Sequence, residues 1–495
     1  MIIKLTLSLL TLLSGCAATQ LSANSSQPAT PTLSDPLPPP VQIVLDGELD
    51  DWYGQTGIRA DQDEVFICFE SFDPAQAIQA ANFTTRIRID ADDDRSTGDR
   101  QMYQMTNPEH DSKIMLSQGV DLRIDISPAG REWGELRGGA KLTSIESGKF
   151  TTIGHADAGF YFLPTHNAPK YEARIDRSKL PMLQHDGPVS IVIEHLAIGG
   201  DVLKTQSFST TLPTYRPDPD SNEPITPKPT QGVRVMSTNV LYSSPLKDPD
   251  PFTRIHNALD PDVVLYQEWF KTTRDDVNDW VEEQLGDGWR LIMPDERSGV
   301  AIATKLKVVE TVSKPLVAHR SDRPSRVVAA IVESHSQDQL IVLSIHLKCC
   351  GGAGSDEDAK RIAQAHQIRG LIHELREDYP HAGVVIGGDF NLVGSREPLE
   401  MMIQGIGVDE QDLVPLPTRV IGTQSMLTWT QASSSYTPGR LDWIVVDDHA
   451  WKPIRSWSLD TEELSEHVLE ATGLMREDSR SSDHLPIVAD LVPIQ

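Results

Sequence analysis

The sequence predicts two domains, an antiparallel β-sandwich over residues 41–213 and an α/β domain over residues 232–495. The first region consists of short apolar runs that alternate with polar residues and are separated by turn residues, as β-strands are. The second alternates strand-like apolar runs with helical patterns. Between them, residues 214–231 are so rich in proline that helices and central strands are excluded, which favours a linker. A length of 495 residues also exceeds one core of ordinary size.

The amino-terminal residues 1–15 are predicted to be a lipoprotein signal peptide. Lys4 precedes an apolar run at residues 5–13 that is too short to span a bilayer as a mature helix. The run ends in Leu-Ser-Gly-Cys, which resembles a bacterial lipobox and implies cleavage before Cys16 and acylation of that cysteine. Ala17 follows instead of an aspartate, so the known sorting behaviour implies the outer membrane of the bacterial cell envelope, on its periplasmic or surface side. A plain secretory signal with an incidental cysteine is the alternative.

Residues 16–40 are rich in Ser, Thr, Gln and Pro, a composition that cannot bury a core and predicts an extended tether. The net charge of −28 favours solubility and argues against a broad basic groove for nucleic acid. It does not exclude a nuclease, because a metal ion and a few local cations can hold phosphate in an acidic protein.

Short alternating or β-branched runs predict the strands of the sandwich domain. Examples are residues 65–69, 85–89, 122–126 and 189–193. Two motifs, LDGELDDW at residues 45–52 and DADDDRSTGD at residues 90–99, resemble family-nine-type carbohydrate-binding modules. The resemblance implies a glycan as the ligand of this domain.

Within the second motif, Asp90, Asp92 and Asp94 have the alternating spacing that can converge on Ca²⁺. Arg95, however, occupies the position of the EF-hand glycine, and Gln101 replaces the closing glutamate. A solvated acidic turn is therefore the alternative to a calcium site.

In the α/β domain, the most informative segment is VVIGGDFN at residues 384–391. A β-branched apolar run predicts a buried strand, and the two glycines allow a close approach of backbone or ligand. Asp389 and Asn391 follow two positions apart, so their side chains can point to the same side at the end of the strand. A carboxylate and an amide there suit a phosphate and its metal ion.

Polar residues recur at the ends of other predicted strands in this domain. They are Asn239, Glu268, His346, Asp442 and the pair Asp483-His484. Each alone has an ordinary explanation as a satisfied core histidine, a capping aspartate or a solvated glutamate. Their repetition in one setting predicts a single site.

The ordered set Asn239, Gln267-Glu268, Ser344-Ile-His-Leu347, Gly388-Asp-Phe-Asn391, Arg440-Leu-Asp442 and Ser482-Asp-His-Leu-Pro486 resembles the endonuclease/exonuclease/phosphatase superfamily. This resemblance covers residues 232–495. It implies a four-layered α/β sandwich, with two central sheets, helices outside and the site at one edge. A helix beginning at residues 356–358 and stopped near Pro380 fits the outer layer.

The resemblance implies Mg²⁺ as the cofactor, with Mn²⁺ as an alternative. Glu268 would hold the ion, Asn239 would complete or orient its ligand shell, and Asp483 would be a further ligand. Carboxylate and amide oxygens are the hard ligands that Mg²⁺ prefers.

Five residues are implied to act on the phosphate. Asn391 would donate to a non-bridging oxygen, and Asp389 would orient or deprotonate the attacking water. Asp442 would hold His484 in one tautomer and stabilise its cationic form. His346 would face the phosphate. The sequence leaves open which of Asp389, His346 and His484 is the base and which the acid.

Hydrolysis of a phosphodiester by in-line attack of water is therefore the predicted function, with a nuclease-like enzyme favoured. Alternatives are a phospholipase C or sphingomyelinase-type activity, a phosphomonoesterase, or a non-catalytic surface-binding lipoprotein. Glu268 is followed by Trp269 rather than the Thr typical of apurinic endonucleases, whereas His346 is shared with deoxyribonucleases and sphingomyelinases. The substrate, nucleic acid or lipid head group, stays open.

Apart from Cys16, the chain has Cys68 and the adjacent pair Cys349 and Cys350. The pair directly follows the strand of His346, so a vicinal disulfide would stiffen a loop near the site. Two neighbouring cysteines without further ligands do not predict a metal site.

Overall fold

The computed structural model of the chain describes residues 42–107, 112–129, 136–217, 219–293, 296–312 and 325–494. The predicted signal peptide and tether, including Cys16, lie outside these residues. Among the helices in the described ranges, none is both long enough and apolar enough to cross a membrane.

The amino-terminal half is built from β-strands that pair antiparallel throughout. The strands are β1 (Gly57–Ala60), β2 (Glu64–Glu70), β3 (Thr84–Asp90), β4 (Asp99–Asn107), β5 (Ser112–Val120), β6 (Leu122–Ile126), β7 (Ala140–Glu146), β8 (Lys149–Ile153), β9 (Tyr161–Leu163), β10 (Lys170–Asp176), β11 (Gly187–Leu196) and β12 (Val202–Leu212). They form a sheet of order β1-β2-β10-β9, a sheet of order β12-β11-β3-β6-β7-β8 and a hairpin, β4-β5. Helix α1 (His155–Ala158) and the 3₁₀ helices η1 (Ile78–Ala80), η2 (Arg177–Lys179) and η3 (Pro181–Leu183) lie in the connections.

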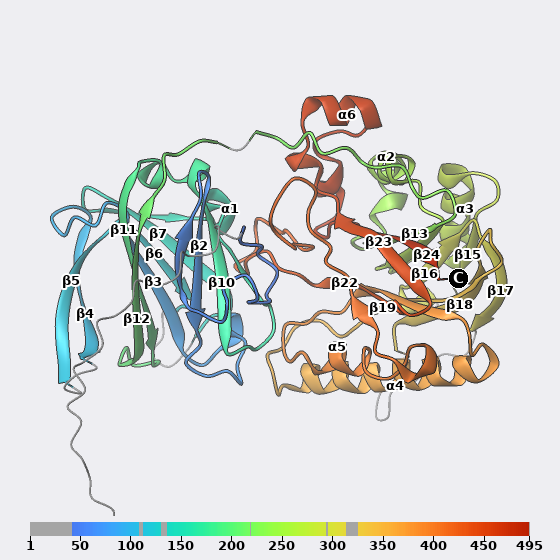
Figure 1. Cartoon of the computed structure of the whole chain (residues 1–495), viewed down its shortest axis with the longest axis horizontal. Coiled ribbons are helices and arrows are strands. Elements are labelled where there is room, and N and C mark those ends of the chain that lie inside the picture. Colours follow the sequence, from blue (N-terminus) through green and yellow to red (C-terminus); the bar gives the residue numbers. More distant parts are fainter. Residues whose placement is uncertain are drawn as a thin grey trace, which may run out of the picture. The chain divides into compact units, whose positions relative to one another are not determined.

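The period-two pattern of the sequence explains this sandwich. On β3, Ile87 and Ile89 are buried in the core between the sheets, where Ile124 of β6 and Ile191 of β11 join them. Arg88, between the two isoleucines, points the other way and pairs with a glutamate of β11. Figure 1 shows the strands of this half, coloured from blue (β2) to green (β12). The predicted antiparallel β-sandwich is confirmed.

The carboxy-terminal half contains two six-stranded mixed sheets. The first, of order β15-β16-β14-β13-β24-β23, consists of β13 (Val233–Asn239), β14 (Val263–Gln267), β15 (Arg290–Ile292), β16 (Ala301–Thr304), β23 (Trp451–Ser458) and β24 (Ile487–Pro493). The second, of order β17-β18-β19-β20-β22-β21, consists of β17 (Lys307–Val312), β18 (Val327–Glu333), β19 (Gln339–His346), β20 (Gly383–Asp389), β21 (Val414–Pro415) and β22 (Asp442–Val446).

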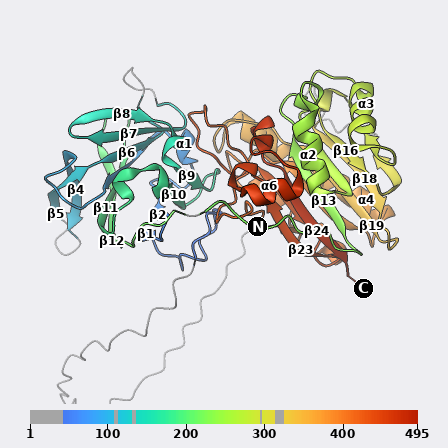
Figure 2. The same ribbon diagram turned by 90° about the horizontal axis from the view of Figure 1, so that it is seen from above.

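Helices cover the outer faces of both sheets. They are α2 (Pro249–Leu259), α3 (Arg274–Leu285), α4 (Asp356–Asp378), α5 (Glu397–Met401) and α6 (Glu466–Thr472), with 3₁₀ turns η4 (Ser244–Leu246), η5 (Glu296–Ser298), η6 (Val408–Glu410), η7 (Thr461–Glu463) and η8 (Asp478–Ser481). Figures 1 and 2 show α2 and α3 beside β13 and β16, and α4 on the side of β19.

Three apolar clusters explain this layering. Trp280 of α3 packs with Val264 on the outer face of the first sheet, and Ile372 of α4 packs with Ile341 on that of the second. Val235 and Val385 belong to the cluster between the sheets. The structure therefore has the predicted four-layered α/β sandwich, preceded by a β-sandwich.

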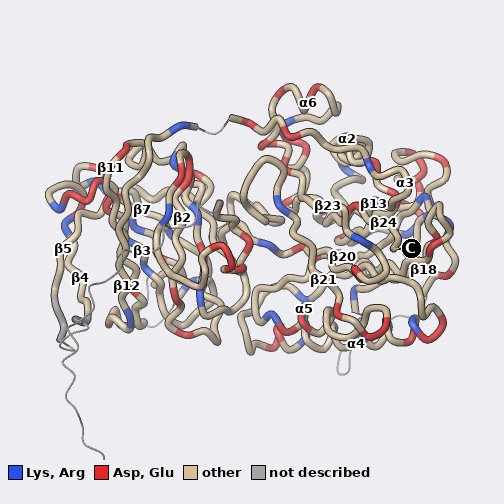
Figure 3. The backbone as a smooth tube through the Cα atoms, in the orientation of Figure 1, with Lys and Arg blue, Asp and Glu red and all other residues tan. Residues whose placement is uncertain are grey.

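The two halves are joined by buried hydrogen bonds within the unit formed by residues 43–495. Thr165 Oγ1 donates to the carbonyl of Leu392 at 2.6 Å, and the amide of Thr437 donates to Gln79 Oε1 at 2.9 Å. The sequence, with its proline-rich segment between the regions, did not predict these contacts. Acidic residues are spread along both halves, as the red segments of the backbone in Figure 3 show.

Candidate active site

Strands β13 and β14 bring Asn239 and Glu268 to the same edge of the first sheet. The two strands are parallel, and Asn239 is paired with Gln267, the residue before Glu268. Glu268 has φ +68, a left-handed conformation that a residue with a side chain adopts only at an energetic cost. Its Oε2 accepts a hydrogen bond from the amide of Tyr242 at 3.2 Å, and Asn239 Oδ1 accepts one from the amide of Leu241 at 3.0 Å.

Strands β19, β20 and β22 place His346, Asp389 and Asp442 side by side at one edge of the second sheet. His346 is in register with Asp389, and Asp389 with Asp442. Gly388 has φ +152, and a Cβ at this position would lie 1.9 Å from the carbonyl oxygen of Ile345. The glycine is required because β20 passes so close to β19 immediately before Asp389.

The side chains from the two sheets converge on the Asp389 carboxylate. His346 Nε2 lies 3.5 Å from Asp389 Oδ2 and 3.9 Å from Glu268 Oε1. His484 Nε2 lies 4.0 Å from the same Oδ2 atom of Asp389. The site therefore has a carboxylate flanked by two imidazoles, with a second carboxylate, that of Glu268, near the same Nε2 of His346.

Asn391 holds Asp389 in place. It adopts a left-handed backbone with φ +49, which asparagine tolerates better than most residues. Its backbone N–H donates to Asp389 Oδ1 at 2.9 Å. Its side-chain Nδ2 donates to Asp389 Oδ2 at 2.8 Å and to the carbonyl of Leu347 at 3.2 Å. The two Nδ2 protons are thus already used, so donation to a phosphate oxygen, as the resemblance implied, requires exchange of one of these bonds.

Asp442 and His484 form a buried pair, with Oδ2 and Nδ1 2.7 Å apart. The amide of His484 donates to Ser482 Oγ at 3.1 Å, and that hydroxyl donates to the carbonyl of Asn239 at 2.8 Å. Thr428 Oγ1 accepts from the amide of Asp442. This network fixes the imidazole and leaves Nε2 directed at Asp389.

Burial and charge give the two histidines opposite protonation tendencies. Burial alone lowers the pKa of His484, but the adjacent Asp442 carboxylate outweighs it and raises the pKa to about 10. Burial lowers the pKa of His346 well below its usual value, and the cationic Arg326 and His484 lower it further. Burial also raises the pKa of Asp389 to about 8, against the attraction of His484. At neutral pH the site therefore pairs a cationic His484 with a neutral His346.

Glu268, Asn239 and Asp483 supply oxygen atoms that fit a divalent cation. Asp483 Oδ2 accepts from Trp429 Nε1 at 3.1 Å, whereas its buried Oδ1 has no hydrogen-bond partner among the described residues. Among the residues that the structure describes, neither Glu268 nor Asp483 forms an ion pair with a lysine or arginine. Carboxylates with a free acceptor and no cationic partner are what Mg²⁺ requires.

Sequence reasoning missed Arg326 and Phe270. Arg326 Nη1 lies 3.4 Å from both ring nitrogens of His346, and its guanidinium lies 4.7 Å from the centre of the Phe270 ring. That ring is 5.8 Å from the His346 ring. The sequence gives only a weak indication of the role of Arg326, which immediately precedes strand β18 and belongs to no recognised motif.

In the sandwich domain, the acidic cluster consists of Asp90, Asp92 and Asp121, whose carboxylate oxygens lie within 4.8 Å of one another. Asp94, predicted to be the third member, lies outside it, because its Oδ1 accepts from the amide and hydroxyl of Ser96. Asp121 belongs to the cluster because it directly precedes β6, the strand that pairs with β3. A sequence spacing within one loop could not reveal it.

Cys68, Cys349 and Cys350 are free thiols. The predicted vicinal disulfide is absent from the described residues, and Cys350 Sγ instead donates to Cys349 Sγ at 3.0 Å. Arg361 anchors this loop by donating to the carbonyls of Lys348 and Cys350. A guanidinium, rather than a covalent bond, holds the backbone there.

Several solved structures are similar to the chain. Zebrafish (D. rerio) TDP2 humanized by 14 mutations shares 16% identity over 53% of this chain and 99% of its own, with a TM-score of 0.38. An endonuclease/exonuclease/phosphatase from Bacteroides vulgatus gives the same identity, coverage and TM-score. The catalytic domain of human Nocturnin shares 18% identity over 53% of this chain and 94% of its own, with a TM-score of 0.36. No curated protein matches the chain.

The model of the Endonuclease/Exonuclease/phosphatase family matches residues 236–484. This span begins in β13, three residues before Asn239, and ends at His484, so it contains every residue of the site described above. The chain therefore belongs to the endonuclease/exonuclease/phosphatase family.

Proposed function

We propose that this protein is a metal-dependent phosphodiesterase that hydrolyses its substrate by in-line attack of water, and that it is nuclease-like. The observation that carries this proposal is the Asp389 carboxylate between two imidazoles of opposite protonation tendency. Such a pairing supplies both a proton acceptor and a proton donor at one phosphate.

Glu268, Asn239 and Asp483 would hold Mg²⁺, or Mn²⁺ in its place. When bound, the ion would neutralise charge on the phosphate oxygens, whose repulsion of a nucleophile makes these esters slow to hydrolyse. Because Glu268 Oε1 lies 3.9 Å from His346 Nε2, an ion held by Glu268 would favour binding of the phosphate beside His346.

Asp389 orients the attacking water and accepts its proton when ionised; burial raises the pKa of this carboxyl to about 8, which makes the ionised form a stronger base. His484, kept cationic by Asp442, stabilises negative charge on the phosphate and can donate a proton from Nε2. Arg326 adds a second cation on the His346 side. Asn391 fixes Asp389 and can exchange one of its hydrogen bonds for a phosphate oxygen.

For location, we propose acylation at Cys16 and a tether over residues 16–40, which would anchor the enzyme to the bacterial outer membrane. An exported enzyme of this kind would act on phosphodiesters outside the cytoplasm. The acidic charge of the chain favours small or single-stranded substrates over the broad surface of a duplex.

Hydrolysis of bis(p-nitrophenyl) phosphate by the purified chain, with and without Mg²⁺, tests the proposal. Single-stranded and duplex DNA, sphingomyelin and a phosphomonoester run in parallel would separate the nuclease from the phospholipase and phosphatase alternatives. We expect Mg²⁺-dependent hydrolysis of the diester and of DNA, and its loss in His484→Ala. A correctly folded chain that hydrolyses none of these five substrates would refute the proposal and favour a surface-binding role.

A further inference from the structure

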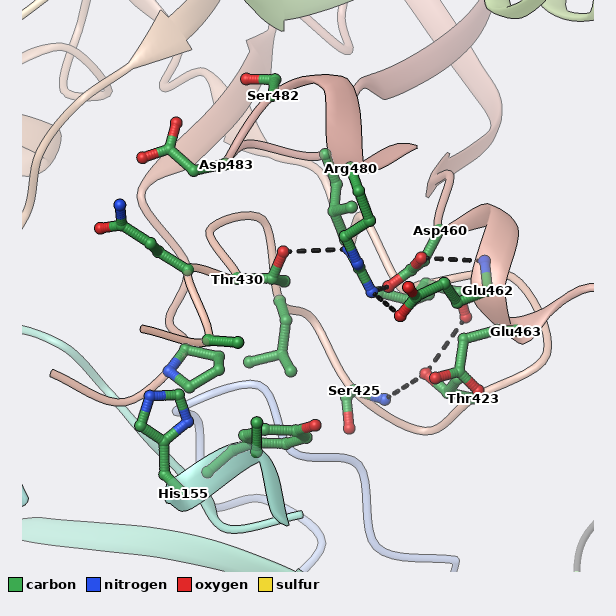
Figure 4. Close-up of a pocket in the computed structure, with 18 of the residues that line it drawn as sticks. His155, Thr423, Ser425, Thr430, Asp460, Glu462, Glu463, Arg480, Ser482 and Asp483 are labelled. Atoms are coloured by element: carbon green, nitrogen blue, oxygen red, sulfur yellow. Dashed lines mark hydrogen bonds and ion pairs between the residues drawn. The ribbon is translucent and has the colours of Figure 1, made fainter. Parts of the chain in front are cut away.

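A cavity of about 420 Å³ lies next to the candidate active site and has walls from both halves of the chain. Ser482 and Asp483 of the site line it on one side. His155 and Tyr161 of the β-sandwich line it on the other, as the close-up in Figure 4 shows for His155. A group attached to the reacting phosphate could therefore enter it from the Asp483 side.

The two walls are held together by direct contacts, so the cavity is already formed without a ligand. Arg174 Nη1 donates to Ser425 Oγ at 3.1 Å, and His155 Nε2 lies 3.1 Å from the carbonyl of Ser434. Leu45 and Leu163 of the sandwich domain belong to one buried cluster with Leu485, the residue after His484. A preformed pocket binds its ligand without paying to order a loop.

Two of the three cationic side chains that line this pocket have carboxylate partners, and the third, Lys179, donates to the carbonyl of Ala156 at 3.2 Å. Arg480 Nη2 lies 2.8 Å from Asp460 Oδ2 and 2.6 Å from Glu462 Oε2, an arrangement visible in Figure 4. Arg174 is paired with Glu64. A second phosphate would therefore meet carboxylates with few available positive charges, which disfavours an anionic ligand.

Recognition of an organic cation by an aromatic cage is also disfavoured. Tyr161 is the aromatic residue of this pocket, and the Arg174 guanidinium lies 5.5 Å from its ring centre. That face of the ring is thus already in a cation–π contact, and no cage of several aromatic faces surrounds the cavity in the described residues.

The remaining lining suits a neutral group with many hydroxyls. The hydroxyls of Ser425 and Thr430 accept from Arg174 and Arg480, and within the described residues each keeps its own proton free to donate. Gln431 contributes an amide, and Glu463 contributes a carboxylate with no side-chain hydrogen bond within the described residues. His155 Nδ1 is buried in the wall and likewise has no partner there. Free donors and acceptors of this kind recognise hydroxyls by hydrogen bonds.

We propose that this pocket binds a sugar ring of the phosphodiester substrate, next to the bond that is cleaved. The β-sandwich then acts as one wall of the substrate site. The inference rests on the proposed phosphodiesterase function, because the sugar is assigned to a pocket that shares Ser482 and Asp483 with the site proposed for the reacting phosphate.

The test compares two chromogenic diesters, the p-nitrophenyl ester of thymidine 5′-phosphate, which has a sugar beside the phosphate, and bis(p-nitrophenyl) phosphate, which has none. In Glu463→Gln we expect kcat/KM to fall about tenfold more on the thymidine ester than on the other, as loss of a charge-assisted hydrogen bond predicts. The matched control is Glu470→Gln on α6, which lies outside the pocket and should leave both activities unchanged. Equal losses on the two esters, or none, would overturn the inference.

A second measurement does not need catalysis. Saturation-transfer NMR with free ribose, glucose and myo-inositol should detect binding to the full chain and to His484→Ala, and Ala156→Trp, which fills the pocket, should abolish it. Absence of binding for all three sugars would refute the pocket assignment even if the enzyme is active. Conversely, an inactive chain that binds a sugar and loses it in Ala156→Trp would refute the proposed function and support the pocket.

Discussion

The pairing of Asp442 with His484 can be tested by a double-mutant cycle. The two atoms are 2.7 Å apart in a buried setting, and His484 Nε2 points at Asp389. His484→Ala removes the proton donor and should lower kcat by ~10²–10⁴-fold, the usual contribution of a general acid or base. Asp442→Asn keeps the imidazole but removes the charge that keeps it cationic and in one tautomer, so its loss should be smaller.

The size of the double-mutant effect distinguishes coupled from independent roles. If Asp442 acts only through His484, the double mutant should be hardly slower than His484→Ala, because residues that act as a unit are strongly non-additive. Independent roles would multiply the two losses, adding at least about tenfold more. The assay is kcat for bis(p-nitrophenyl) phosphate under saturating Mg²⁺.

Two exposed positions serve as controls, His373→Ala on α4 and Asp287→Asn after α3. Both should retain wild-type kcat. Multiplicative losses in the cycle, with unchanged controls and intact folding by circular dichroism, would mean that the buried pair does not work as one catalytic unit.

Four further outcomes are expected. Activity should vanish with EDTA and return with Mg²⁺, and Glu268→Gln should raise the Mg²⁺ concentration needed for half-maximal rate; full turnover in excess chelator would rule out the metal. Arg326→Met should lower kcat/KM by roughly 10- to 100-fold through loss of a charged donor, measured on the same diester; an unchanged value would remove Arg326 from the site. Gly388→Ala should destabilise the fold by at least about 2 kcal/mol in urea unfolding, because the backbone has φ +152 there and an added Cβ would clash with the Ile345 carbonyl. Gly370→Ala in α4 should not destabilise it, since its Cβ meets open space. Similar effects at both positions would contradict the steric argument. Cys16→Ser should release the protein from the membrane fraction or block its processing, and processed protein retained there would refute the lipid anchor.

Hydrophobic pattern was sufficient to predict individual elements, whereas the four-layered arrangement was implied by the family resemblance. The apolar runs that end at Asn239, His346 and Asp389 are β13, β19 and β20, and the helix expected from residues 356–358 is α4, which begins at Asp356 after a Ser355 cap. These elements are determined locally, by side-chain period and capping, so single-sequence reasoning can find them.

The positions of the residues that the sequence did not reveal, Arg326 and Asp121, depend on long-range packing. Arg326 reaches His346 because β18 and β19 are antiparallel neighbours, with Val327 opposite Ile345. Asp121 joins Asp90 because β6 lies beside β3. Neither residue has a spacing that signals its role, because strand neighbours are set by the topology of the sheet and not by local sequence.

The same limit explains why the sandwich domain appeared to be a separate module. The segment at residues 214–231 reads as a linker, but the contacts of Thr165, Arg174 and His155 with the second half lie far from it in sequence. Those contacts place the sandwich against the loops that follow β20 and precede β22, which also carry the site. Asp389, His346 and His484 do not need a wall contributed by the sandwich domain. The position of that wall beside Asp483 is therefore the strongest structural reason to treat substrate selection as a property of both domains.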